Sequence, residues 1–261
     1  MALLARVDAD TRGQELRQRL RAERVHTGYV IEDAAAPTGV ALIMVGADGE
    51  KQILTAPGAN RRVSAEDVAA AAGAIRSTRV LLSQLEAPPE AVLATVEIAH
   101  AAGAQVVLDP APATPLPDEL LQRLTVIRPN AHEAEVLTGI PVRDRTSARE
   151  AARALLARGA GAAVVQAGSA GDLLVWPEGE HFLPRLPVVS VDATGAGDAF
   201  AATIAVSLAQ GSPLSRAAEF GSAAAALATT QPGAWAGLGR WREIHTLLRD
   251  RQENGGSADE V

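Results

Sequence analysis

A glycine-rich segment in the last third of the chain places a carboxylate beside a potential anion site. The segment reads Asp192-Ala-Thr-Gly-Ala-Gly-Asp198 and joins a run of β-forming residues to an apolar helical pattern. Gly195 and Gly197 allow the backbone to turn tightly and to approach a ligand closely. The first amides of the helix have no partner within it and favour an anion such as a phosphoryl group. Because Asp198 could accept a hydroxyl proton, the segment indicates phosphoryl transfer to an alcohol.

The segment is also compatible with simpler structures. A Gly-Ala-Gly fragment is common, and an aspartate at a helix start needs no role beyond capping. Phe200 stands where a dinucleotide-binding fingerprint has its third glycine, which disfavours a nicotinamide-dependent oxidoreductase. No Gly-Lys-Ser/Thr occurs, so the sequence has no Walker A loop.

A second polar cluster, Arg128-Pro-Asn-Ala-His-Glu133, follows a predicted strand. A helix that starts after Asn130 places Glu133 one turn along. In one interpretation the two residues form a capping box. In the other, Glu133 lies near bound phosphates, and the two roles are compatible. We expect His132 to be a solvated helix residue.

The spacing of apolar residues predicts the elements that position these clusters. Short β-rich runs alternate with helical patterns, which predicts a doubly wound, mostly parallel α/β sheet with both faces covered. The hairpin expected over 172–176 and 180–183 lies at a sheet edge. The helix that follows Gln210 is expected to have Ser212 as its N-cap and Pro213 at its first position. The expected strands are 79–84, 105–108, 124–128, 162–166 and 188–191, and the expected helices are 88–102, 131–137, 146–158 and 198–210.

The N-terminal third predicts a second hairpin. Residues 39–45 and 51–56 flank an Asp-Gly turn within 47–50. Val40 and Leu42 share one strand face, and Ala41 and Ile43 share the other. Apolar residues on both faces indicate that both are covered, either by another subunit or by the hairpin's own domain.

The composition excludes several classes of protein. The 261 residues are 48% hydrophobic, which is enough for a large core. The net charge is −7 and the basic residues are scattered, so we expect no nucleic-acid partner. No apolar run reaches about 18 residues, so we expect no membrane span. The absence of cysteine fits a reducing compartment, and the apolar run at the N-terminus is too short for a signal peptide, so we expect a cytoplasmic location.

The segment over 192–198 resembles the C-terminal signature of the ribokinase (PfkB-type) carbohydrate kinase family. The resemblance implies that Asp198 is the catalytic base and a contact of the sugar. It implies that Gly195, Ala196 and Gly197 form the anion hole. It also assigns a potassium loop, whose residues are Asp192, Thr194, Ala228 and Gly233.

Further segments match the family in the same order. The hairpin over about 37–57 is similar to the family's lid, and Glu86 lies in a Gln84-Leu-Glu segment whose glutamate reaches the sugar. Leu108-Asp-Pro-Ala-Pro-Ala is a family-like strand end. The resemblance implies that Asn130 and Glu133 place the magnesium–ATP complex, with Glu133 acting through water. It assigns ATP to Gly168, Ser169, Gly171 and Ser222, although Gln166 replaces a common threonine and the small residues after Ser222 also suit close helix packing.

The resemblance implies an ATP-dependent kinase that phosphorylates ribose at its primary hydroxyl. We expect a kinase domain over 1–248, a disordered tail over 249–261 and a homodimer formed through the lid. The front of the chain departs from the family, because Arg6-Val-Asp8 belongs to an element normally found well inside it. The first βα unit and its sugar-binding residues are absent, which we expect to reflect a start internal to a longer protein. The alternatives are a family member acting on fructose, a keto-sugar acid or a nucleoside, or a paralogue that binds nucleotide without catalysis.

Overall fold

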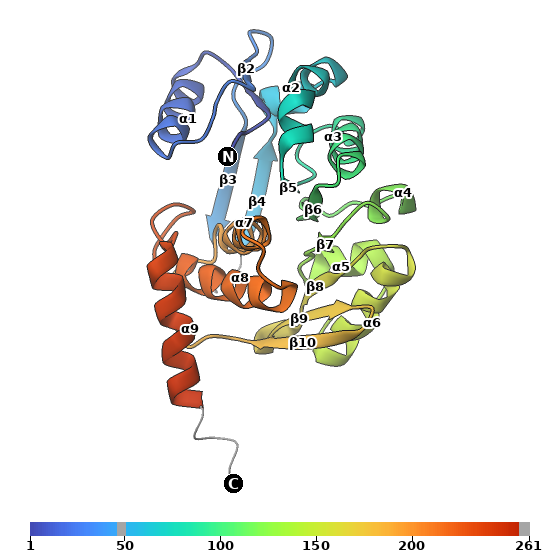
Figure 1. Cartoon of the computed structure of the whole chain (residues 1–261). Helices are drawn as coiled ribbons and strands as arrows, with labels where there is room; N and C mark the ends of the chain where they lie inside the picture. The colour runs from blue at the N-terminus through green and yellow to red at the C-terminus, as the bar shows by residue number, and fades with distance from the viewer. Residues whose placement is uncertain (46–50, 256–261) are drawn as a thin grey trace. The chain divides into compact units, whose positions relative to one another are not determined.

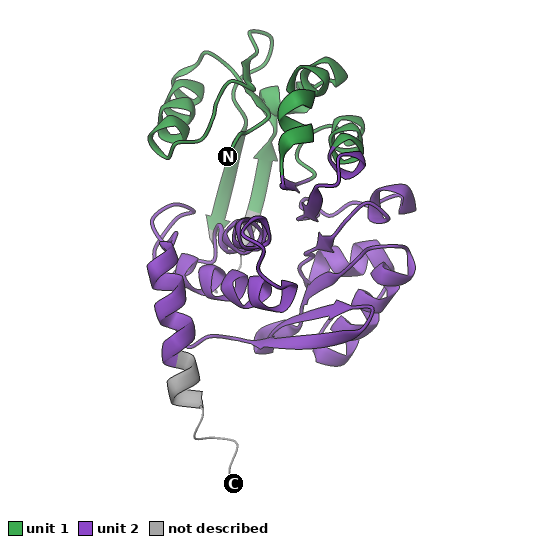
Figure 2. Ribbon diagram, viewed as in Figure 1, with its two compact units in different colours: residues 1–78, 85–98 green, residues 79–84, 99–261 purple. Residues whose placement is uncertain are grey.

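The computed structural model describes residues 1–45 and 51–255, which form two compact units. One unit holds 1–78 and 85–98, and the other holds 79–84 and the chain from residue 99 onward (Figure 2). The Asp-Gly turn predicted within 47–50 lies outside the described residues, and the single kinase domain over 1–248 stays a prediction.

The larger unit contains a six-stranded sheet in the order β10-β9-β8-β7-β6-β5 (Figure 1). The strands β5 to β8 are parallel, and β9 and β10 add an antiparallel hairpin at one edge. The mostly parallel sheet and the edge hairpin confirm the predicted fold class. The strands are β5 (Val80–Ser83), β6 (Gln105–Leu108), β7 (Val126–Ile127), β8 (Ala163–Gln166), β9 (Gly171–Trp176) and β10 (Gly179–Pro184). The helices are α4 (Asp118–Leu121), α5 (Ala131–Thr138), α6 (Arg145–Ala157), η2 (Gly168–Ala170), α7 (Ala196–Ala209), α8 (Leu214–Ala228) and α9 (Trp241–Gly255).

Both faces of this sheet are buried. Val107, Val164 and Leu174 pack with Phe200 and Ile204 of α7 in one core cluster. Their strand neighbours, which point to the opposite face, are also at most 3% exposed. On that second face α6 contributes buried alanines and Leu155. Burial on both faces explains why these strands are short, continuous apolar runs rather than alternating ones.

The smaller unit contains two separate strand pairs. The pair of β1 and β2 is parallel, and the pair of β3 and β4 is the predicted antiparallel hairpin. Leu42, Ile53 and Leu54 of this hairpin are 55%, 62% and 63% exposed. The chain therefore presents an apolar hairpin that its own unit leaves uncovered. The elements are β1 (Ala5–Val7), α1 (Thr11–Ala22), β2 (Val30–Glu32), β3 (Val40–Val45), β4 (Lys51–Ala56), η1 (Gly58–Arg62), α2 (Ala65–Ser77) and most of α3 (Pro89–Ala101).

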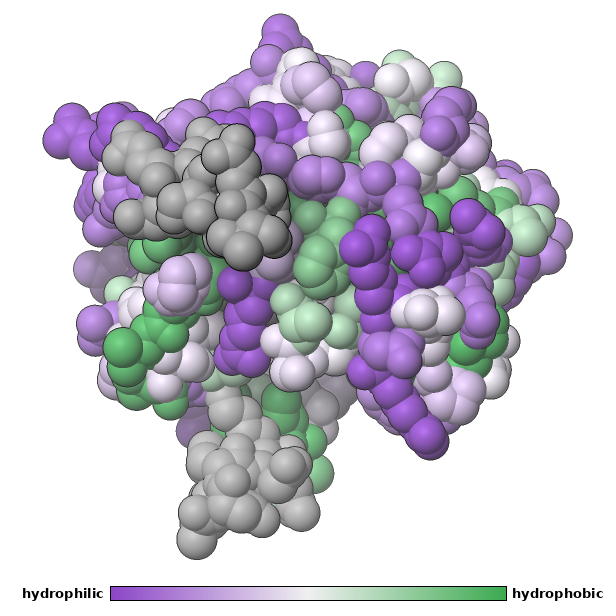
Figure 3. Space-filling model, turned by 90° about the horizontal axis from the view of Figure 1, so that it is seen from below, coloured by the Kyte–Doolittle hydropathy of each residue, from purple (hydrophilic) through white to green (hydrophobic). Residues whose placement is uncertain are grey.

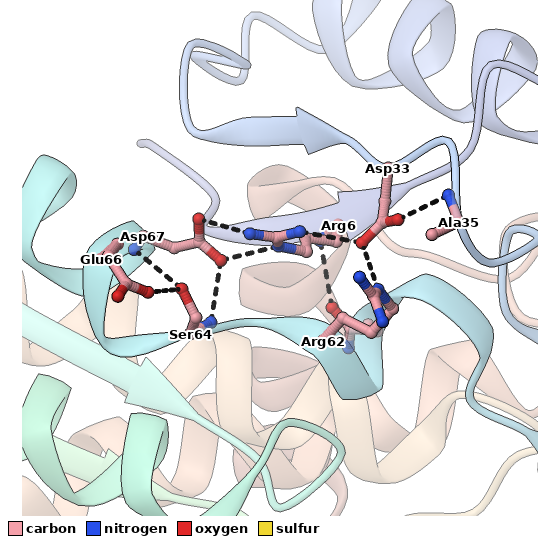
Figure 4. Close-up of polar contacts among 8 residues, drawn as sticks. Arg6, Asp33, Ala35, Arg62, Ser64, Glu66 and Asp67 are labelled. Carbon is pink, nitrogen blue, oxygen red and sulfur yellow. Dashed lines mark hydrogen bonds and ion pairs between the residues drawn. The ribbon is translucent and has the colours of Figure 1, made fainter.

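A charged network ties the elements of the smaller unit together (Figure 4). The Arg6 guanidinium donates to both oxygens of Asp67, at 2.7 and 2.9 Å, and to Asp33 at 2.8 Å. Asp33 also accepts from Arg62 at 2.8 Å. The backbone N–H of Ala35 and the two arginines lower the pKa of Asp33 to about 2. The network joins β1, the loop after β2, η1 and α2 through two buried carboxylates, Asp33 and Asp67.

Four predictions about the larger unit need correction. Residues 188–191 are not a strand, because the Val191 amide bonds the Thr229 carbonyl at 2.7 Å instead of a neighbouring strand. The helix after the glycine-rich segment begins at Ala196, two residues before Asp198. The N-cap of α8 is Pro213 rather than Ser212. The predicted start of the tail, residue 249, lies inside α9.

Hydrophobic residues lie among hydrophilic ones on the face seen in Figure 3. Large apolar side chains such as Trp235 and Leu238 are nearly half exposed. In the part of the chain that the structure describes, no helix combines the length and the apolar character needed to cross a membrane.

Candidate active site

The glycine-rich segment forms a tight turn into α7. Gly195 is the N-cap, with φ 80°, and a Cβ atom there would lie 3.1 Å from Ala234. A side chain at this position would therefore meet both left-handed strain and a close neighbour. The Ala196 amide donates a 3.3 Å bond to the Ala193 carbonyl. Within the described residues the amides of Gly197 and Asp198 have no acceptor in the protein, so two free donors begin the helix.

Asp198 is exposed on the first turn of α7 and is held by a glutamine. Its Oδ1 atom accepts a 2.9 Å hydrogen bond from Nε2 of Gln84. Gln84 directly follows β5, Asp109 directly follows β6, and Arg128 directly follows β7. The carboxyl ends of parallel strands meet at one edge of a sheet, which is where α/β proteins bind ligands. The helix start and three strand ends therefore form one polar site.

Asp109 is a buried carboxylate of this site, only 4% exposed. Its pKa is raised to about 6, chiefly because burial removes water from the charged form. The nearby carboxylates of Glu133 and Asp198 raise it further, whereas Arg128 and a hydrogen bond with Gln84 lower it. The strand end at Asp109 was recognised in the sequence as family-like, but no role was assigned to it. A polar residue directly after a buried strand was the available signal.

Arg128 is the cation of the site and was missed in the sequence. Its guanidinium stacks over the Phe200 ring at 4.8 Å, and Nη2 lies 3.8 Å from Oδ1 of Asp172. Burial raises the pKa of Asp172. Among the described residues, Nε of Arg128 and Oδ1 of Asp172 have no hydrogen-bond partner. The site therefore holds a buried charge pair without a direct hydrogen bond between its members.

Asn130 and Glu133 form the predicted capping box at the start of α5. Oδ1 of Asn130 accepts from the Glu133 amide, and Oε2 of Glu133 accepts from the Asn130 amide, both at 2.8 Å. Glu133 is 6% exposed and lies close enough to Asp109 to raise its pKa. The capping role is thus confirmed, and a role toward phosphates stays a prediction.

Asp192 joins the two halves of the predicted cation loop. The first half is the segment before α7 and the second half is the segment after α8. The Oδ1 atom of Asp192 accepts from the amide and the hydroxyl of Thr194, at 2.9 and 2.7 Å. Its Oδ2 atom accepts from the Gly233 amide at 2.8 Å. A Cβ atom on Gly237 would lie 2.3 Å from the Ala228 carbonyl oxygen, so the second half packs tightly against the end of α8.

The residues expected to bind ATP have structural reasons of their own. Gly168 and Gly171 have φ values of 68° and 145°, and a Cβ atom on Gly171 would lie 2.0 Å from the Leu183 carbonyl oxygen. Ser169 lies between them in η2. Ser222 follows Gly221, where an added Cβ would lie 2.8 Å from the Phe200 ring. Close helix packing therefore explains the small residues there, and nucleotide contacts at these positions stay predictions. Glu86 belongs to the smaller unit, and its contact with sugar also stays a prediction.

The carboxylates of the site do not form a complete metal cage. No group of three or more possible metal-ligating side chains occurs in residues 1–45 and 51–255. Magnesium ordinarily keeps several waters and uses one or two carboxylates together with substrate phosphates. Asp109 and Glu133 fit such an ion, with the remaining ligands coming from water and the nucleotide.

Comparison with known proteins identifies the relatives of this chain. The model of the pfkB family carbohydrate kinases matches residues 1–238. The ribokinase of Staphylococcus aureus is 34% identical over 224 residues, which are 85% of this chain and 74% of that protein. The ribokinase of Haemophilus influenzae is 32% identical over 248 residues, or 95% and 81% of the two chains. The structure of Arabidopsis thaliana ribokinase complexed with ribose and ATP matches with a TM-score of 0.85 at 28% identity, covering 95% of this chain and 81% of that one.

Proposed function

Because the chain belongs to the pfkB family of carbohydrate kinases, we propose that it transfers the γ-phosphoryl group of ATP to the primary hydroxyl of ribose. The observation that carries the proposal is the pairing of Asp198 with the free amides at the start of α7. A base and an anion site lie together within one helical turn. The ribokinases among its relatives, one of them solved with ribose and ATP, support ribose as the acceptor.

In this proposal Asp198 takes the proton of the attacking hydroxyl. The amides of Gly197 and Asp198 then stabilise the negative charge on the phosphoryl group in transfer, where fixed donors act more strongly than mobile water. Phosphoryl transfer depends mainly on position and charge stabilisation, so no covalent intermediate on the protein is needed. Bound ATP supplies the phosphoryl group, and magnesium neutralises part of its charge.

The cofactors are assigned to residues of the larger unit. Asp109 and Glu133 would hold magnesium, with Glu133 acting through water. A potassium ion would bind at Asp192, Thr194, Ala228 and Gly233. Because both carboxylate oxygens of Asp192 already accept loop donors, backbone carbonyls would be the main ligands of that ion. The residues assigned to ATP itself are Asn130, Glu133, Gly168, Ser169, Gly171 and Ser222.

The exposed apolar hairpin supports a homodimer. Leu42, Ile53 and Leu54 lie more than half exposed on a two-stranded sheet. We propose that a second copy covers this surface and that the hairpin also serves as the lid of the sugar site, with Glu86 as a sugar contact. A cytoplasmic location is supported by the absence of cysteine.

The test is consumption of ATP by the purified chain with magnesium and potassium, with and without ribose. Fructose and a nucleoside are the competing acceptors. We expect ribose to stimulate turnover most, and we expect removal of potassium to lower it. Asp198→Asn should reduce turnover at least about 100-fold by removing the base. Asp118→Asn, an exposed aspartate on α4, is the matched control and should retain activity.

The outcomes separate the alternatives. Stronger stimulation by fructose or a nucleoside would replace ribose as the substrate. Binding of ATP without turnover for any acceptor would identify this chain as a nucleotide-binding protein rather than a kinase. Equal turnover by Asp198→Asn and the unaltered chain would remove Asp198 from the mechanism.

A further inference from the structure

Gln84 holds the exposed carboxylate of the site. Its Nε2 atom donates to Oδ1 of Asp198 at 2.9 Å. An ionised carboxylate only accepts hydrogen bonds, so the contact must use the amide NH2 group. Gln84 directly follows β5, so the sheet sets the position from which it reaches Asp198.

The two partners differ in mobility. Gln84 is half-buried and follows β5 directly, so its position is set by the sheet. Asp198 is exposed on the first turn of a helix, where an aspartate side chain can occupy several rotamers. The bond from Gln84 fixes one rotamer and occupies Oδ1. The other oxygen, Oδ2, is then left to accept a proton from a substrate hydroxyl.

We propose that Gln84 is a positioning residue for the base Asp198. The inference rests on the proposed function, because it assigns Asp198 its role as base. It adds a residue to which the resemblance to the family gave no role. Gln84 does not touch the reacting atoms in this scheme and acts only through Asp198.

Charged side chains surround the start of α7. Nη1 of Arg128 and Oδ2 of Asp109 would lie 3.1 and 3.8 Å from a Cβ atom built on Gly197, so both side chains reach the anion loop next to Asp198.

A structural role for Gln84 is the competing explanation, since a half-buried amide at a strand end also adds to stability. The two explanations differ in what they predict for a charged replacement. Gln84→Leu removes the bond to Asp198, whereas Gln84→Glu keeps the shape and adds a carboxylate. When that glutamate is protonated, its O–H can again donate to Asp198. A purely structural role predicts no such recovery.

The experiment compares Gln84→Leu and Gln84→Glu with the unaltered chain in ribose-dependent turnover. Gln84→Leu should lower kcat about 10- to 100-fold, with the KM for ATP changed less than about threefold, because only the base is displaced. The ratio of kcat for Gln84→Glu to that for Gln84→Leu should rise as the pH falls from about 8 to about 6. Gln105→Leu, the same change at the opposite end of the neighbouring strand, should leave kcat within about twofold.

A second measurement needs no turnover. Nitrogen-15 NMR should show the side-chain NH2 signal of Gln84 moving in Asp198→Asn, because that group donates to Oδ1 of Asp198. The signal should not move in Asp118→Asn. An unmoved signal in Asp198→Asn, or a kcat for Gln84→Leu equal to that of Gln105→Leu, would overturn the inference. Absence of turnover in the unaltered chain would count against the proposed function alone, and the NMR comparison would still decide whether Gln84 contacts Asp198.

Discussion

A Cβ atom on Gly197 would lie 3.1 Å from Nη1 of Arg128, so the anion loop is packed directly against the buried cation of the site. The guanidinium cannot withdraw easily, because it is stacked over Phe200 and is largely buried. A side chain at position 197 would therefore press against Arg128 and displace the free amide of this residue.

Gly197→Ala should therefore reduce turnover more than stability. Position 197 has no left-handed backbone, so alanine adds only the contact with Arg128. We expect kcat to fall about 10-fold or more as the free amides shift. The free energy of unfolding should fall by about 1 kcal/mol or less.

Gly195→Ala is the informative comparison, because φ there is 80°. It should cost about 1–2 kcal/mol of stability as well as activity. Urea unfolding and steady-state kinetics on the two variants give both quantities. Equal stability losses in the two variants would contradict this account of the loop.

The raised pKa of Asp109 should appear in the pH dependence of stability. Its folded-state pKa, about 6, lies above the ordinary value for an aspartate. The folded state therefore binds this proton more tightly than the unfolded state. The resulting stability is present below about pH 4 and is lost as the pH rises through about 6, by up to about 3 kcal/mol.

Asp109→Asn removes this titration and is the test. As the pH rises from about 4 to about 7, the unaltered chain should lose the unfolding free energy that comes from Asp109. Asp109→Asn should not show this loss, so its stability relative to the unaltered chain should increase. Urea unfolding at several pH values measures it. A difference that is constant with pH would show that Asp109 titrates normally.

Asp33 should show the opposite dependence on pH. Its pKa is lowered to about 2 by the Ala35 amide, Arg62 and Arg6. The stability it contributes is therefore present above the ordinary aspartate pKa, near 4, and is lost as the pH falls through about 2. Asp33→Asn should lower the Tm at neutral pH, because Arg6 and Arg62 lose a charged partner.

The effect of Asp33→Asn should shrink as the solution is acidified. Thermal unfolding followed by circular dichroism at neutral and acidic pH measures it. Asp144→Asn, at an exposed N-cap far from this network in sequence, is the control for a general effect of losing an aspartate. An unchanged Tm for Asp33→Asn at neutral pH would contradict a stabilising role for the network.

The hairpin should control the oligomeric state. Ile53 and Leu54 are adjacent on β4 and more than 60% exposed. Charged residues at a subunit interface would be buried without partners, so Leu54→Asp should convert a dimer to monomers. Light scattering after gel filtration reports the mass. Val189→Asp, at a valine that is 84% exposed in the larger unit, should leave the mass unchanged.

Monomers in the unaltered chain would remove the dimer proposal. A dimer that persists in Leu54→Asp would place the interface elsewhere. Circular dichroism of both variants checks that neither charge unfolds the chain.

The sheet could be predicted from the sequence because its strands are buried on both faces. Runs such as 105–108 and 163–166 are continuous and apolar, and helical patterns separate them, so period and length both identify them. The strand expected over 188–191 failed because β-forming residues need a partner strand. Val189 and Val191 are exposed, and the backbone there bonds a loop carbonyl.

The candidate site could be predicted where it is local in sequence. Asp198 and its helix start, and the capping box of Asn130 and Glu133, each lie within a few residues. The contact of Gln84 with Asp198 joins residues 114 positions apart, and no local pattern reports it. Arg128 was missed because its charge became significant only when the sheet placed it beside Asp109 and Asp172.

The two oxygens of Asp192 connect the segment before α7 to the segment after α8, and thereby close a loop of 41 residues. Closing such a loop costs conformational entropy, and a ligand that binds only the closed loop favours the closed form. A cation bound near Gly233 and an anion bound at the start of α7 should therefore strengthen each other's affinity, even without touching. Thermodynamic linkage makes this effect equal in both directions, so the anion should tighten cation binding by the same factor.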